Sequence, residues 1–137
     1  LVNFSDRRLA PYLIQSLTDD KSADVRATAA EALGKLRARQ ALPQLIQALG
    51  DPEWYVRQAA AEALGNIADL QALEPLLKIL RNDNEKRDVR QAAGVAISRL
   101  ALPHPDAVLE LPTSDQHAIG RAVQQRLREQ IKQALCK

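Results

Sequence analysis

Apolar residues recur along three stretches of the chain with the period of an α-helix. The stretches open at Val25, Val56 and Val89, so their starts are 31 and 33 residues apart. In each stretch, small or apolar residues follow the Val at +4, +7, +8 and +11. This spacing places them on one broad stripe of a helix, whereas a half-buried strand would alternate with a period of two. We therefore predict three helices that each bury one face.

A second apolar run precedes each of these helices. The three runs begin at a proline and cover residues 11–17, 43–49 and 75–80. A short polar turn follows each run, so the repeating unit is a helix A, a turn and a helix B. One such unit cannot bury its apolar face alone, and stacked copies can. The pattern predicts an all-α protein, an α-solenoid in which helix pairs form a right-handed superhelix.

The repeats occupy most of the chain, and a different kind of segment follows them. The predicted units are residues 1–101, with helix pairs at approximately 6–36, 40–67 and 71–101; a proline-containing linker at 102–113; and a C-terminal amphipathic helix at 114–137. The prolines at the start of the linker stop helical continuation. The last repeat of a solenoid needs a cover for its apolar face, so we expect the final helix to pack there as a cap.

The final helix has a second interpretation. Its apolar stripe is spaced by four residues and its charge is mainly basic, which would also suit docking on a partner or on an anionic surface. It lacks the Trp or Phe that anchors interfacial helices, so capping is favoured. The stripe consists of Ile119, Val123, Leu127, Ile131 and Leu135.

The turns contain residues that start helices. Asp51 is predicted to be the N-cap of the second B helix, with Pro52 as its first helical residue. Ser22 and Asn84 are expected to cap the first and third B helices.

Composition agrees with closely packed helices in one domain. Only 3 % of the 137 residues are aromatic, so the core must consist of Leu, Ile, Val and Ala. The single cysteine, Cys136, cannot form an internal disulfide, which favours a reducing, cytoplasmic location. No apolar run reaches the roughly 20 residues that would insert in a membrane. Because the chain opens at Leu1 and contains no Met, we expect it to be part of a larger protein.

The repeats resemble HEAT repeats, in particular the short, Ala-rich subtype named after the phycobilisome lyases. The resemblance rests on three shared features and covers approximately residues 6–101. The features are a proline in helix A (Pro11, Pro43, Pro75), an acidic residue in the turn (Asp19 or Asp20, Asp51, Asp83), and a Val-Arg pair that opens helix B. The third copy departs from the pattern, because Ser98 stands where the other copies have Gly34 and Gly65. This departure suggests a unit near the end of the array.

The resemblance implies a role for the arginine of each Val-Arg pair. It would hydrogen-bond the turn acid of its own or a neighbouring repeat and so fix the stacking, and we prefer this to a contact with phosphates. The residues of this predicted structural ladder are Asp20, Arg26, Asp51, Arg57, Asp83 and Arg90.

The resemblance also implies that the B helices line a concave surface. The outward positions there carry charges of both signs, which argues against a nucleic-acid cradle, since such a surface would be uniformly basic. A protein partner of mixed charge fits better, and the alternative is a solvated face without a binding role. The predicted contact residues are Glu31, Lys35, Gln58, Glu62, Asn66, Gln91 and Arg99.

Two adjacent aromatic residues, Trp54 and Tyr55, open the second B helix, where the other repeats have none. Trp and Tyr are enriched at binding hot spots, so these rings are a candidate anchor at the edge of the concave surface. The alternative is that Trp54 packs over its own turn.

The sequence offers little for catalysis. His104 and His117 have no neighbouring ligand at metal-binding spacing, and no phosphate-binding loop or nucleophile elbow is present. We therefore predict a non-catalytic protein-interaction module or scaffold with no metal and no cofactor. The alternative, which comes only from the resemblance, is a bilin lyase or lyase partner that attaches or removes a tetrapyrrole on phycobiliproteins. A HEAT-like nucleic-acid-binding protein is less favoured.

Overall fold

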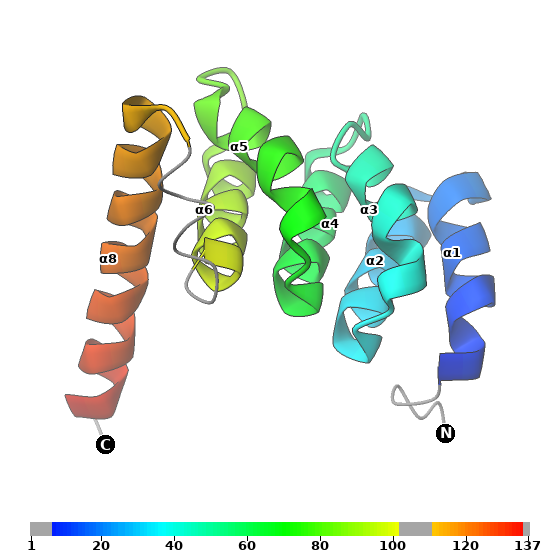
Figure 1. Ribbon diagram of the computed structural model, residues 1–137. Helices are drawn as coiled ribbons and strands as arrows, with labels where there is room; N and C mark the ends of the chain where they lie inside the picture. Colours follow the sequence, from blue (N-terminus) through cyan, green and yellow to red (C-terminus); the bar gives the residue numbers. More distant parts are fainter. Residues whose placement is uncertain (1–6, 102–110, 136–137) are drawn as a thin grey trace.

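The computed structural model describes residues 7–101 and 111–135. These residues form seven α-helices, namely α1 (Ala10–Asp19), α2 (Ala23–Leu36), α3 (Leu42–Ala48), α4 (Trp54–Ile67), α5 (Leu73–Arg81), α6 (Arg87–Ala101) and α8 (Thr113–Leu135). The helices lie side by side, with α1 at one end of the array and α8 at the other (Figure 1). The prediction of an all-α solenoid is confirmed.

The helices form two layers with different spacing. In the B layer, α4 packs extensively against both of its neighbours, α2 and α6. In the A layer, neighbouring helices touch much less: α1 and α3 share few contacts, and α3 and α5 share still fewer. An array whose one layer is closely spaced and whose other layer is spread must curve toward the close layer. The B helices therefore line the inner, concave side.

Glycine permits the close approach of the B helices. A methyl group added at Gly34 would lie 2.6 Å from the Cα atom of Ala63 on the next B helix. The same group at Gly65 would lie 2.9 Å from the Cα atom of Ala96. Since these distances are below van der Waals contact with a backbone atom, each junction between repeats requires a residue without a side chain.

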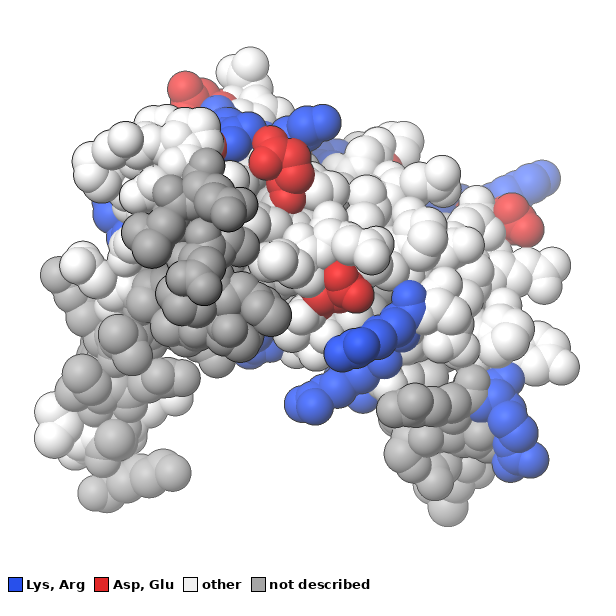
Figure 2. Space-filling view, viewed as in Figure 1, with Lys and Arg blue, Asp and Glu red and all other residues white. Residues whose placement is uncertain are grey.

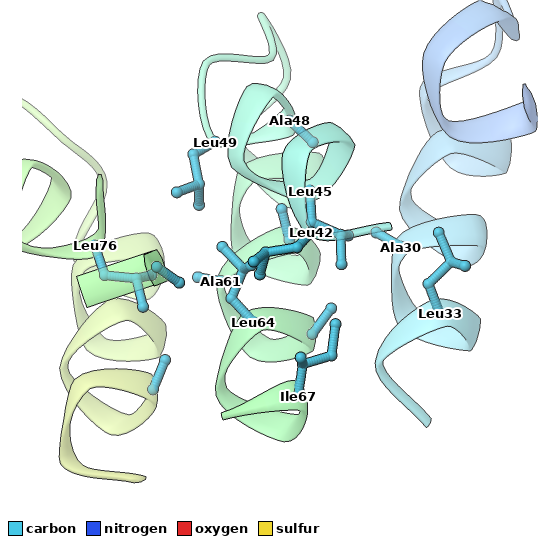
Figure 3. Close-up of a cluster of buried hydrophobic side chains, with 14 of the residues drawn as sticks. Ala30, Leu33, Leu42, Leu45, Ala48, Leu49, Ala61, Leu64, Ile67 and Leu76 are labelled. Carbon is cyan, nitrogen blue, oxygen red and sulfur yellow. The ribbon is translucent and has the colours of Figure 1, made fainter. Parts of the chain in front are cut away.

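The core lies between the two layers and contains leucines from every repeat. Leu33, Leu45, Leu64 and Leu76 are fully buried and interdigitate across neighbouring helices (Figure 3). The buried apolar residues among those described are Leu, Ile, Val and Ala, as the composition predicted. Burial of each such leucine stabilises the fold by roughly 2 kcal/mol.

The starts of the helices differ from the prediction at two of three B helices. Ser22 caps α2, its Oγ accepting a hydrogen bond from the N–H of Val25. Asp51 is not the N-cap of α4, because the helix begins at Trp54 and the Asp51 carboxylate accepts from the Glu53 N–H two residues on. Asn84 does not cap α6 either, because the longer third turn delays the helix to Arg87.

The last helix lies at the end of the array (Figure 1). α8 begins at Thr113, one residue before the predicted start, and packs against α6. Asp115 and Ile119 of α8 are buried. Most of the predicted linker, residues 102–110, lies outside the described residues. Among the helices of the described part, none is long and apolar enough to cross a membrane.

Candidate functional site

The first arginine of the predicted ladder connects two repeats. Nε and Nη2 of Arg26 donate to the two carboxylate oxygens of Asp51, at 2.9 and 3.1 Å. Nη1 of the same side chain donates to the carbonyls of Asp20 and Lys21 in its own turn. Arg26 therefore binds two successive turns, and Asp20 contributes its backbone carbonyl to this contact.

The second arginine repeats this geometry with a different acid. Nε and Nη2 of Arg57 donate to the carboxylate of Glu85 at 2.9 and 2.8 Å, and Nη1 donates to the Asp51 carbonyl. Asp83, the predicted ladder acid of this turn, does not bind Arg57. The third turn is longer, so Asp83 projects into solvent with 95 % of its side chain exposed and Glu85 reaches Arg57 instead.

The third arginine does not continue the series. Nη2 of Arg90 lies 3.9 Å from Asp83, at the limit of an ion pair, and its buried Nε has no hydrogen-bond partner in the described structure. The junction with the last helix is instead made by Arg81 of α5, which binds the carboxylate of Asp115 on α8 and also contacts Glu74.

These ion pairs lower the pKa values of their carboxylates. Burial alone would raise the pKa of Asp51 and of Glu85, but hydrogen bonds from Arg26 and Arg57 hold both pKa values below the ordinary ones. At Asp115, the hydrogen bond from Arg81 outweighs burial and lowers the pKa in the same way. All three carboxylates are therefore ionised at neutral pH.

The concave side carries an open groove between α4 and α6. It has a volume of about 390 Å³, and its polar lining residues come from positions that do not serve the core. Five of the seven predicted contact residues line it: Gln58, Glu62, Asn66, Gln91 and Arg99. Asp88, which the sequence pattern did not single out, also lines the groove from the first turn of α6.

The other two predicted contact residues lie apart from this groove. Glu31 and Lys35 are exposed on α2 and form an ion pair of 3.1 Å with each other, one helical turn apart. They do not line the groove of α4 and α6, so their predicted role as contact residues stays a prediction.

The two aromatic residues pack against each other, and Trp54 also contacts the next repeat. The rings of Trp54 and Tyr55 meet edge to face, with centroids 5.7 Å apart. Nζ of Lys86, just before α6, lies 5.2 Å from the Trp54 ring centroid. Burial, followed by the nearby carboxylate of Asp24, raises the pKa of Tyr55. These contacts give both rings a role in packing, and their role as an anchor stays a prediction.

A second cavity adjoins the groove and was not anticipated from the sequence. It has a volume of about 840 Å³ at the C-terminal ends of α2 and α4, and it shares Gly65, Asn66 and Arg99 with the groove. Arg37 and Arg39, from the loop that follows α2, also line it. A loop between two repeats gives no periodic signal, so only the folded chain reveals this arrangement.

Comparisons with known proteins agree with the architecture. A family model described as HEAT repeats matches residues 10–98. The solved structure of the complex of CpcE and CpcF of phycocyanin lyase from Nostoc sp. PCC7120 contains a similar chain, with 30 % sequence identity and a TM-score of 0.65. The similarity covers 96 % of the present chain and 57 % of that chain, so the present chain spans little more than half of its length. Among curated proteins, none matches the sequence.

Proposed function

The chain belongs to the HEAT-repeat family, and from this premise we propose that it is a non-catalytic module that binds a protein partner on the concave face of its B helices. The main observation behind this proposal is the groove between α4 and α6. It presents amide and carboxylate side chains, from Gln58 and Glu62 on one wall to Gln91 on the other, that no core contact requires. Polar groups held on rigid helices at fixed spacing suit recognition of another polypeptide.

The chemistry of the groove supports binding over catalysis. Its described lining contains no Ser, Thr, Tyr, Cys, His or Lys, so the hydroxyl, thiol, imidazole and amine groups that most often act in catalysis do not line it. In the described part of the chain, no group of three or more His, Cys, Asp or Glu residues is placed to hold a metal ion.

The charge distribution favours a partner of mixed charge. On the face shown in Figure 2, most of the surface of the described residues is neither acidic nor basic, and side chains of both signs lie among it. A nucleic-acid surface would instead present a continuous basic stripe. The similar structure in the comparison is itself a complex of two proteins, which supports a protein partner here.

A pair of matched variants tests this proposal. Glu62→Lys reverses a charge in the groove, and Asp19→Lys makes the same change at the end of α1, in the outer layer. Both residues are exposed, so both variants should melt like the wild type. We expect affinity capture from a lysate of the source organism, quantified by mass spectrometry, to lose one protein with Glu62→Lys and to keep it with Asp19→Lys. A partner kept by both variants would place the binding surface elsewhere.

A lyase-related role is the second candidate, because the similar structure is a complex of a phycocyanin lyase. On this view the concave face would hold a bilin or the protein that carries one. Titration of the chain with free phycocyanobilin should then change the visible absorbance spectrum of the pigment. A spectrum that stays constant up to saturating protein would remove direct bilin binding from consideration.

A further inference from the structure

Three arginine side chains converge on the cavity that adjoins the concave groove. Arg37 and Arg39 reach it from the loop after α2, and Arg99 reaches it from the last turn of α6. Gln40 and Asn66 complete the polar lining. None of its described lining residues is acidic, so the cavity concentrates positive charge and hydrogen-bond donors.

Arg37 and Arg39 are exposed, and their contacts differ from those of Arg26 and Arg57. Arg26 and Arg57 each bind a carboxylate with two hydrogen bonds. Arg37 and Arg39 have no carboxylate within 4 Å in the described structure. Their guanidinium groups are therefore available to an incoming ligand.

Arg99 adds a second, independent observation. Its Nη1 donates to Oδ1 of Asn66, which orients the guanidinium group in the cavity. Its Nε is buried and has no hydrogen-bond partner in the described part of the chain. A buried donor without a partner is unfavourable by about 1–3 kcal/mol, and an oxyanion in the cavity would remove that penalty.

We propose that this cavity is an oxyanion-binding site that receives carboxylate side chains of the protein segment bound along the concave groove. This inference rests on the proposed function. Arginine suits the task, because its planar group presents two parallel N–H donors that match a carboxylate.

The adjoining groove identifies the ligand as a polypeptide and not a nucleic acid. Groove and cavity share Gly65, Asn66 and Arg99, so one extended ligand can occupy both. Glu62 and Asp88 line the groove and would repel a continuous phosphate backbone. A protein segment can place acidic side chains at the three arginines and basic or amide side chains opposite these two carboxylates.

The arginines also have a structural explanation. Basic residues near the C-terminal end of a helix stabilise the helix dipole, and α2, α4 and α6 all end near this cavity. On that explanation alone, removing the arginines lowers stability and the cavity binds no anion. A binding measurement at the arginine side chains separates the two explanations.

The test is a titration of the ¹⁵N-labelled chain with hexaglutamate, followed through the Nε–Hε NMR signals of arginine. We expect saturable shifts of the Arg37, Arg39 and Arg99 signals, while those of Arg26 and Arg57 stay in place. Arg99→Gln and Arg37→Glu/Arg39→Glu should each weaken binding about tenfold or more. Lys78→Glu/Arg87→Glu is the matched control, since it reverses two exposed charges outside the cavity and should bind like the wild type.

Three further ligands set the limits of the proposal. Hexalysine should leave the three signals unmoved, and inorganic phosphate should bind more weakly than hexaglutamate because it lacks a second charged group at chain spacing. No shift with hexaglutamate, or equal weakening by the control variant, would overturn the site. Tighter binding of a thymidine oligonucleotide at the same arginines would overturn the choice of a protein ligand.

The outcome is distinguishable from failure of the proposed function. If hexaglutamate does not bind but Glu62→Lys still loses the captured partner, the concave face binds protein and only the oxyanion site is wrong. If Glu62→Lys and Asp19→Lys both keep the partner while hexaglutamate shifts the arginines, an anion site exists but not on the partner surface proposed here, and the inference fails as stated.

Discussion

The two junctions between repeats differ in construction from the junction with the last helix. At α2–α4 and α4–α6, a glycine faces an alanine on the next B helix, and an arginine connects neighbouring turns. At α6–α8, the corresponding position is Ser98, which is fully buried and donates its hydroxyl to the Val95 carbonyl. The connecting arginine there, Arg81, comes from the A helix α5.

The difference shows which features serve stacking and which serve termination. Glycine is needed only where another B helix stacks with its backbone in contact. No further B helix follows α6 in the described chain, where the neighbouring element is α8, and the corresponding position is occupied by a residue with a side chain, Ser98. The repeat junctions should therefore be sensitive to small changes, and the terminal junction should tolerate them.

Among the variants that test this difference between junctions, removal of Arg57 should lower the free energy of unfolding most. Arg57→Ala leaves the Glu85 carboxylate, which is only 6 % exposed, without its partner, and we expect a loss of about 3 kcal/mol in the free energy of unfolding. Urea unfolding at pH 7 measures it. The double variant Arg57→Ala/Glu85→Ala should recover part of the loss, because no unpaired carboxylate remains. An unchanged urea midpoint in the single variant would show that the arginine does not hold the junction.

A methyl group at the first junction should have the next largest effect. Gly34→Ala places a Cβ atom 2.6 Å from the backbone of α4, so the helices must separate, at about 2 kcal/mol. Gly120→Ala in α8 is the matched control, because no atom beyond its own stretch of helix lies within 4 Å of the added methyl group. The control should be more stable by about 0.5–1 kcal/mol, since alanine favours the helix. Thermal melts that shift in the same direction for both variants would contradict the difference between the junctions.

Acid should weaken the repeat junctions by a smaller and graded amount. The pKa values of Asp51 and Glu85 are lowered in the folded chain, so the unfolded chain binds more protons at acidic pH. The stabilisation is complete above their ordinary pKa values of 3.8 and 4.5 and is lost as the pH falls through and below them. Melting temperatures measured from pH 7 to pH 3 should fall in that window, and less steeply in Glu85→Gln. A melting temperature that rises on acidification would refute the assignment.

The smallest effect is expected at the terminal junction. Arg81→Gln also removes the charged partner of a carboxylate, since the Asp115 side chain is only 7 % exposed. Arg81 itself is 43 % exposed, so solvent screens the pair and water can reach Asp115 in the variant, and we expect a loss of about 1 kcal/mol in the free energy of unfolding. Hydrogen exchange followed by mass spectrometry should show faster exchange in α8 and unchanged exchange in α2 and α4. Faster exchange throughout the chain would mean that α8 stabilises the whole array rather than its end.

The sequence predicted most of the fold, because the helical period and the repeat are local and additive. It predicted the ladder less completely. Arg26 and Asp51 both stand at positions of the regular repeat pattern, so their pairing follows from that pattern. Glu85 replaced Asp83 because two extra residues in the third turn changed which carboxylate reaches Arg57, and no count of periodic positions contains that information.

The candidate site divides in the same way. The groove residues lie at regular positions on α4 and α6, so the period predicted five of them. Arg37 and Arg39 belong to a loop, and their meeting with Arg99 depends on the spacing of three helices. Side chains that are distant in sequence converge only when packing fixes the distance between their elements.

By itself, the sequence determined the helices, their pairing into repeats, the ring-free core and the glycines that let B helices touch. The tertiary structure alone decided what each copy of the pattern does. Val25, Val56 and Val89 are equivalent in the sequence, yet Val25 is 40 % exposed while the other two are fully buried. The reason is physical: a periodic pattern specifies which face of a helix is apolar, but burial depends on the helix that packs against that face.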